Sequence, residues 1–236
     1  MSEQPQREER QPIVPEQLGL YPRFIAAICR VGMRAIARVR VEGLDDLPTS
    51  GPLIVATNHM SNADPPLVGG WLLPALKRRP TFLAKEAIFV GPLGLFLDSL
   101  GAEPVKAGSS DIGAYRAAKA LLDRGGVVVI MPEGTRSYDG VLSRPKPGVS
   151  LLATRTGAPV LPVGVSGTDR LLRRGQRLPH VGASVTMRVG RPFHLRLPQG
   201  SERRSALADA DDELMRRIAA LVDARHRGAY EPWPQD

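Results

Sequence analysis

The stretch PLIVATNHMSNADPP, residues 52–66, decides the fold class because a buried strand gives way to a helix start within it. Residues 52–56 are apolar and predict a buried strand, whereas residues 58–62 are rich in loop-forming Asn and Ser. Asp64 before Pro65 is typical of a helix N-cap followed by proline at the first helical position. The stretch therefore predicts a strand–loop–helix unit of an α/β sheet.

His59 and Asp64 stand five residues apart at this junction. On one continuous helix their side chains would diverge by roughly 140°, so they can meet only if the chain bends between them. A carboxylate on one imidazole nitrogen would fix the tautomer and support the cation, leaving the other nitrogen to act as a base. The plainer interpretation stays open here, in which Asp64 only caps the helix and His59 only satisfies a loop carbonyl.

Short strands and helices alternate along most of the chain, with hydrophobic runs bounded by turn residues. Strands are predicted at residues 52–56, 81–84, 103–106, 127–131, 159–165 and 184–189. Helices are predicted at residues 65–76, 87–99, 112–124, 149–156 and 205–225. This rhythm predicts an α/β fold, a single domain whose mostly parallel central sheet is flanked by helices.

The N-terminal part differs from this pattern. Residues 1–17 are polar and predict a disordered lead rather than a signal peptide, and residues 18–42 predict an amphipathic helix. The α/β domain is expected at residues 43–228, followed by a tail at 229–236.

Four arginines recur through the apolar stretch at residues 21–40. On a helical wheel they share a sector of roughly 80°, and apolar residues occupy the remaining arc. They are Arg23, Arg30, Arg34 and Arg38. Such a helix can lie in the headgroup region of an anionic membrane. The alternative is a helix packed on the domain with its arginine edge in water.

Composition narrows the classes of partner. The formal net charge of +8 favours anionic partners, and only 5% of residues are aromatic, so single-stranded nucleic acid is a poor candidate. Cys29 is the only cysteine, and the histidines lack metal-ligand spacing, so neither a disulfide within the chain nor a metal site is expected. The longest uncharged apolar runs, residues 65–76 and 87–97, are too short to span a bilayer.

A second chemical signal follows the apolar run at residues 127–131. The sequence PEGTRS, residues 132–137, would bring polar groups to the same sheet edge as His59. Gly134 permits close backbone approach, and Arg136 offers a planar fork suited to phosphate oxygens. The block lacks the P-loop pattern, and the chain has no hydrolase-type nucleophile. A simple turn with an exposed arginine is the alternative.

Together the blocks His59–Asp64 and Glu133–Arg136 resemble the HX4D and EGTR motifs of the glycerolipid acyltransferase family, the lysophosphatidate acyltransferase-like proteins. The family's second block corresponds to residues 101–106 and its fourth to residues 160–163. Lys106 stands where the family usually has arginine, which replaces a bidentate phosphate contact by a point charge.

The resemblance implies roles for individual residues. His59 would be the general base, and Asp64 would orient it. The acceptor's phosphate would be bound by Lys106, Glu133, Gly134, Thr135 and Arg136. Asn58, Gly101 and Pro162 are expected to support the site.

The implied reaction moves a fatty acyl chain from acyl-CoA or acyl carrier protein to the hydroxyl of lysophosphatidate, giving phosphatidate. The thioester is a co-substrate, and no cofactor or nucleic acid is implied. Anionic membrane lipids are expected partners, with the protein peripheral on the cytoplasmic face of the membrane. The alternatives are a glycerol 3-phosphate or other lysophospholipid acyltransferase, a transacylase, a hydrolase, and a catalytically idle membrane-binding module.

Overall fold

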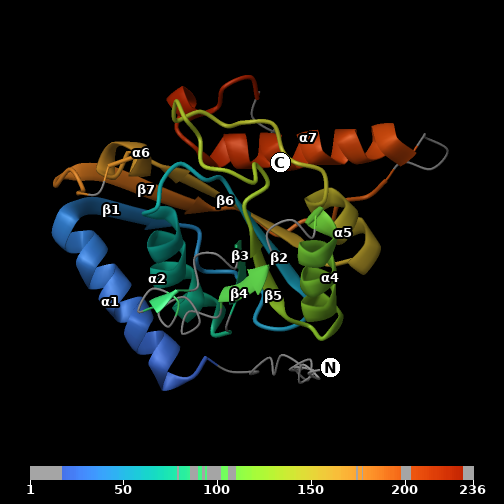
Figure 1. Ribbon diagram of the computed structural model, residues 1–236, viewed down its shortest axis with the longest axis horizontal. Coiled ribbons are helices and arrows are strands. Elements are labelled where there is room, and N and C mark those ends of the chain that lie inside the picture. Colours follow the sequence, from blue (N-terminus) through green and yellow to red (C-terminus); the bar gives the residue numbers. More distant parts are fainter. Residues whose placement is uncertain are drawn as a thin grey trace, which may run out of the picture.

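The computed structural model describes residues 18–78, 80–85, 90, 91, 94, 102–105, 110–173, 175, 176, 178–197 and 203–230. Its centre is a seven-stranded sheet in the order β1-β7-β6-β2-β5-β3-β4 (Figure 1). The strands are β1 (Ala37–Glu42), β2 (Leu53–Thr57), β3 (Pro80–Lys85), β4 (Ala102–Val105), β5 (Val127–Ile130), β6 (Val160–Ser166) and β7 (Ala183–Val189). All described pairings between these strands are parallel except that of β6 with β7. The mostly parallel sheet predicted from the sequence is confirmed.

Helices cover both faces of the sheet (Figure 1). They are α1 (Leu20–Ile36), α2 (Asp64–Leu76), α4 (Ser110–Asp123), α5 (Val149–Thr156), α6 (Thr168–Leu171) and α7 (Arg203–Leu221), with a 3-10 turn η2 (Ala224–His226) after α7. Successive residues of β2 alternate between the two layers, as the pleat of a strand requires. Leu53 and Val55 pack with α2, whereas Ile54 and Ala56 pack with α4, α5 and α7. Burial on both faces explains why β2 is apolar without interruption from Leu53 to Ala56.

Two neighbouring parallel strands place the candidate site at one sheet edge. β2 pairs with β5 in a register that sets Ala56 opposite Ile130. Because the two strands run the same way, the segments that follow them emerge together. The predicted meeting of the His59 block and the PEGTRS block is therefore confirmed.

The amphipathic helix predicted at residues 18–42 is wrong at its C-terminal end. α1 stops at Ile36, and residues 37–42 form the edge strand β1, which pairs in parallel with β7. Arg-Val-Arg-Val at residues 38–41 alternates with a period of two, and pairing with β7 outweighs continuation of the helix. Arg38 thus lies on a strand, where its guanidinium donates to the carbonyl of Gly182 at 3.1 Å. The domain boundary predicted at residue 42 is misplaced, because β1 belongs to the sheet.

Two smaller expectations also change. Asp64 is the first residue of α2, and Ala63 occupies the N-cap position. The last long helix ends at Leu221 instead of residue 225. Most of the helix predicted at residues 87–99, the lead at 1–17, and most of the tail lie outside the described residues. Within the described part of the chain, no helix is long and apolar enough to cross a membrane.

Candidate active site

His59 and Asp64 form the predicted pair. The Nδ1 atom of His59 donates to Asp64 Oδ2 at 2.9 Å. Asp64 is fully buried, whereas the His59 side chain keeps 18% of its surface exposed. With Nδ1 engaged, Nε2 carries the lone pair that can accept a proton. Such an arrangement can act as a base with an orienting carboxylate.

Asp64 also organises the loop that carries His59. Its Oδ2 atom accepts the backbone N–H groups of Met60 and Ser61, each at 2.7 Å. The carboxylate lies in the first turn of α2, where the helix dipole favours negative charge. One oxygen therefore fixes both the imidazole and the bend that brings it there.

Asn58 joins this loop to the neighbouring strand β6. Its Nδ2 donates to the Val165 carbonyl at 2.9 Å, and its Oδ1 accepts the Val165 N–H at 2.7 Å. Both ends of a buried amide are thus satisfied, which a side chain in this position must achieve. Pro162 is buried in the same strand, and its carbonyl accepts the Gly190 N–H at 2.9 Å.

The resemblance places Glu133 among the phosphate-binding residues, and the structure shows its carboxylate accepting two backbone N–H groups. The side chain is buried, and its Oε1 accepts the backbone N–H of His59 at 2.9 Å. Its Oε2 accepts the N–H of Ser143, also at 2.9 Å. Burial raises the pKa of Glu133, although these amide hydrogen bonds work in the opposite direction. Glu133 is therefore a link between the His59 backbone and the segment after the EGTR block.

The other residues of the EGTR block are more accessible. Gly134 and Thr135 are exposed, and Arg136 is half-buried. Gly134 has a φ of +66°, and a Cβ there would lie 2.6 Å from the Cδ of Lys146. The Lys146 stem thus crosses directly over Gly134. Lys146 adds a further cation next to the EGTR block. Neither of the two motifs contains this residue, which a separate loop brings to Gly134.

Gly101 and Lys106 lie outside the described residues. Among the described residues, no three His, Cys, Asp or Glu side chains gather closely enough to hold a metal ion.

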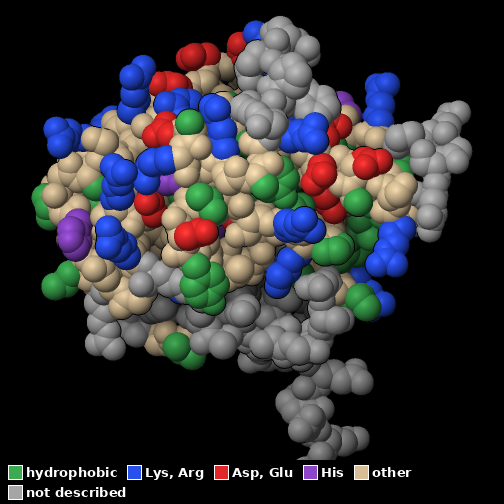
Figure 2. Space-filling model, turned by 90° about the horizontal axis from the view of Figure 1, so that it is seen from above, with side chains coloured by type: hydrophobic (Ala, Val, Ile, Leu, Met, Phe, Trp, Pro, Cys, Tyr) green, Lys and Arg blue, Asp and Glu red, His purple; other side chains and the backbone are tan. Residues whose placement is uncertain are grey.

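The arginines of α1 line one flank of that helix. Arg23 and Arg34 are exposed and Arg30 is half-buried. The Arg34 guanidinium lies 5.5 Å from the centroid of the Trp71 ring on α2. On the face shown in Figure 2, basic side chains are dispersed and interspersed with acidic ones. Among the described side chains on that face, the basic ones do not join into one continuous stripe.

Comparison with known proteins identifies the family to which this site belongs. The model of the family described as acyltransferase matches residues 38–166, more than half of the chain. The chain belongs to the acyltransferase family. The matched range contains His59, Asp64 and the whole EGTR block.

Acyltransferases that act on 1-acyl-sn-glycerol 3-phosphate are among the similar proteins. The chloroplastic enzyme LPAT1 of Arabidopsis thaliana is 30% identical over 176 residues, which are 72% of this chain and 48% of that protein. The Bacillus subtilis enzyme is 25% identical over 209 residues, 85% of this chain and 98% of that protein. The chain thus spans about half the length of the plant relative and nearly all of the bacterial one.

A solved structure shares the fold. It is the 1-acyl-sn-glycerophosphate acyltransferase PlsC from Thermotoga maritima, with a TM-score of 0.66 and 28% sequence identity. The match covers 82% of this chain and 76% of that one. The resemblance to glycerolipid acyltransferases inferred from the two motifs is therefore confirmed for family and fold.

Proposed function

We propose that this acyltransferase moves a fatty acyl chain from a thioester, acyl-CoA or acyl carrier protein, to the free hydroxyl of lysophosphatidate, giving phosphatidate. The observation that carries the proposal is the hydrogen bond of 2.9 Å from His59 Nδ1, in the loop after β2, to the buried Asp64 at the start of α2. Lysophosphatidate as acceptor is supported by the similar proteins, which are acyltransferases of 1-acyl-sn-glycerol 3-phosphate.

The reaction needs a base and no protein nucleophile. Nε2 of His59 removes the proton of the acceptor hydroxyl as that oxygen attacks the thioester carbonyl carbon. Asp64 stabilises the resulting imidazolium through Nδ1. When the tetrahedral intermediate collapses, the carbon–sulfur bond breaks, and the imidazolium returns its proton to the departing thiolate. The new ester and the free thiol balance the reaction.

The acceptor's phosphate would lie against the exposed part of the EGTR block. Arg136 supplies a guanidinium, and Lys146 crosses Gly134 close by. Lys106 is a further candidate from the family resemblance. A phosphate bound by two or more cations would hold the acceptor hydroxyl in line with the thioester, and such positioning can contribute several kcal/mol to catalysis.

The substrate is a lipid, and α1 supplies a surface that suits a membrane. Five large apolar side chains of α1 are exposed to solvent: Leu20, Tyr21, Phe24, Ile28 and Val31. At about 100° per residue they share one sector of the helix, next to the sector of Arg23, Arg30 and Arg34. The apolar sector would enter the acyl boundary while the arginines contact lipid phosphates. We propose that the protein is peripheral on the cytoplasmic face, where thioester donors are found.

The primary test supplies purified protein with palmitoyl-CoA and either lysophosphatidate or glycerol 3-phosphate in phosphatidylglycerol-containing vesicles. Thiol release and product mass are followed for the wild type, His59→Ala and a control, His194→Ala, which alters an exposed histidine. We expect His59→Ala to lower turnover by about 10²- to 10⁴-fold, the range for loss of a general base. Turnover within a few-fold of wild type would reject His59 as the base. Turnover with glycerol 3-phosphate alone would change the acceptor, and fatty acid released without acceptor would indicate a hydrolase.

A further inference from the structure

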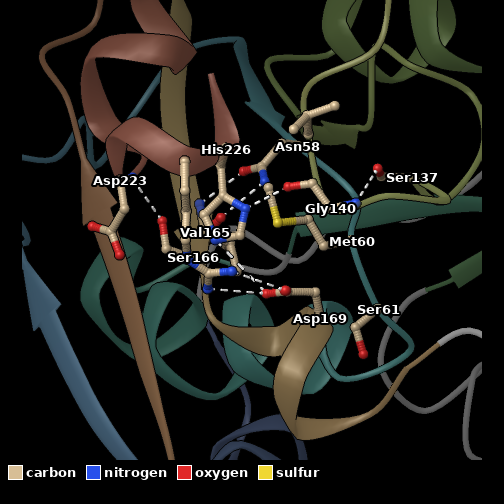
Figure 3. Close-up of polar contacts among 12 residues, drawn as sticks. Asn58, Met60, Ser61, Ser137, Gly140, Val165, Ser166, Asp169, Asp223 and His226 are labelled. Atoms are coloured by element: carbon tan, nitrogen blue, oxygen red, sulfur yellow. Dashed lines mark hydrogen bonds and ion pairs between the residues drawn. The ribbon is translucent and has the colours of Figure 1, made fainter. Parts of the chain in front are cut away.

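The segment that follows α7 folds back onto the loop after the EGTR block. His226, in η2, is fully buried. Its carbonyl accepts the N–H of Leu142 at 2.8 Å, and its Nδ1 hydrogen-bonds the carbonyl of Gly140 (Figure 3). One residue near the C-terminus therefore contacts the loop through both its backbone and its side chain.

This loop, residues 137–143, also holds the backbone of His59, through both its carbonyl and its N–H group. The N–H of Ser137 donates to the His59 carbonyl at 2.8 Å. The N–H of Ser143 donates to Glu133, whose other oxygen accepts the N–H of His59. Inside the loop, the Gly140 N–H donates to Ser137 Oγ at 2.9 Å. A displacement of Gly140 would therefore reach His59 through a short series of hydrogen bonds.

The His226 ring lies between the Gly140 carbonyl and the Asp169 carboxylate, and only the Gly140 carbonyl is a hydrogen-bond partner, because Nε2 has none among the described residues. Gly140 O meets Nδ1 on the loop side, and Oδ1 of Asp169, in α6, lies 3.7 Å from Nε2 (Figure 3). Asp169 also pairs with the Arg225 guanidinium, at 3.1 Å and 3.4 Å. Because the ring is buried, removing its donor would leave the Gly140 carbonyl without this partner in an interior position, which is costly unless the loop moves.

We propose that His226 is a positioning residue for acyl transfer, acting through Gly140 and Leu142 to hold the loop that fixes the backbone of His59. His226 itself takes no part in the chemistry. The expected effect of His226 on turnover rests on the proposed function of His59. Its expected effect on the order of the loop does not depend on that function.

Three substitutions separate the contacts of the ring. His226→Asn keeps an amide donor close to the position of Nδ1, so it can still serve Gly140. His226→Gln places its amide near the position of Nε2, on the side of Asp169, and away from Gly140. His226→Leu fills a similar volume without any donor. Ser150→Ala is the control, because it removes a partly buried hydrogen bond to Asp211 that ties α5 to α7.

The variants are assayed for kcat and for the KM of lysophosphatidate, with thermal melting to verify folding. We expect His226→Leu and His226→Gln to lower kcat roughly 10- to 100-fold, the effect of a small misplacement of a catalytic group, with KM changed less than about threefold. His226→Asn should recover most of kcat, and Ser150→Ala should shift melting without lowering kcat. Equal losses in all three His226 variants, or a kcat in His226→Leu within twofold of wild type, would overturn the proposal.

Amide hydrogen exchange of residues 131–143 on the same proteins provides a measurement that does not require activity. Exchange there should be faster in His226→Leu than in His226→Asn or Ser150→Ala. If the wild type proves inactive with lysophosphatidate but this difference is observed, the proposed function fails and the holding of the loop stands. If exchange is equal in His226→Leu and His226→Asn, the positioning role is rejected whatever the activity.

Discussion

Replacing Asp64 by Asn separates the charge of this residue from its geometry. Oδ2 of Asp64 accepts the His59 Nδ1–H and the two N–H groups of Met60 and Ser61. An Asn with its carbonyl oxygen in the same place accepts all three, so the loop should keep its shape. Its amide nitrogen takes the place of Oδ1, a buried atom with no hydrogen-bond partner among the described residues. We expect a loss of stability of about 1 to 3 kcal/mol from this unsatisfied donor group.

The loss in catalysis should exceed the loss in stability. Two unit charges about 4 Å apart attract by about 4 kcal/mol at an effective dielectric constant near 20. The carboxylate is fully buried, but His59 is partly exposed, and solvent screening lowers this figure to about 2 to 4 kcal/mol. Because the imidazole is charged only as the proton is transferred, the loss appears in kcat, as roughly 30- to 1,000-fold.

Thiol release with saturating lysophosphatidate and palmitoyl-CoA measures kcat, and a cycle with His59→Ala tests the coupling. If Asp64 acts only through the imidazole, the double variant should be no slower than His59→Ala alone. The reasoning is refuted if Asp64→Asn folds and keeps kcat within threefold, or if the losses of the two single variants multiply in the double variant.

The remaining predictions concern the EGTR block and α1. Glu133→Gln should lower kcat, because its amide nitrogen must face one of the two backbone N–H groups that the carboxylate accepts. Burial raises the pKa of Glu133, so the folded wild type holds this proton more tightly than the unfolded chain does. Its free energy of unfolding should therefore fall as the pH rises from the ordinary carboxyl range through the raised pKa. Urea titrations at several pH values should find this dependence in the wild type and not in Glu133→Gln. Arg136→Ala should raise the KM of lysophosphatidate roughly tenfold or more. The control Arg155→Ala, on an exposed side of α5, should leave this KM unchanged. A change confined to the KM of the thioester would contradict the assigned phosphate contact. The double variant Phe24→Glu, Val31→Glu changes two exposed apolar residues of α1, and less of it should sediment with phosphatidylglycerol vesicles. Its turnover of a dispersed short-chain substrate should not change. Unchanged vesicle binding would argue against α1 as the membrane contact.

Local patterns were enough to find most of the strands and helices. β5 is apolar throughout and β2 is apolar from Leu53 to Ala56 because both strands are buried, and polar residues follow each apolar run. The same reasoning failed at residues 37–42, because an arginine every fourth residue fits a helix and alternating Arg and Val fits a strand. Only the pairing of β1 with β7, residues far apart in the chain, resolves that ambiguity.

The sequence by itself determined the α/β class, the His59–Asp64 pair and the sheet edge at which the two motifs meet. These features depend on periodicity, on a bend of a few residues and on the rule that neighbouring parallel strands end at the same edge. Tertiary structure alone decided that Glu133 serves the backbone of His59, that Lys146 crosses Gly134, and that His226 reaches Gly140 from the far end of the chain. Such contacts join residues far apart in sequence, and their formation depends on how the packed sheet orients each loop, which no local pattern encodes.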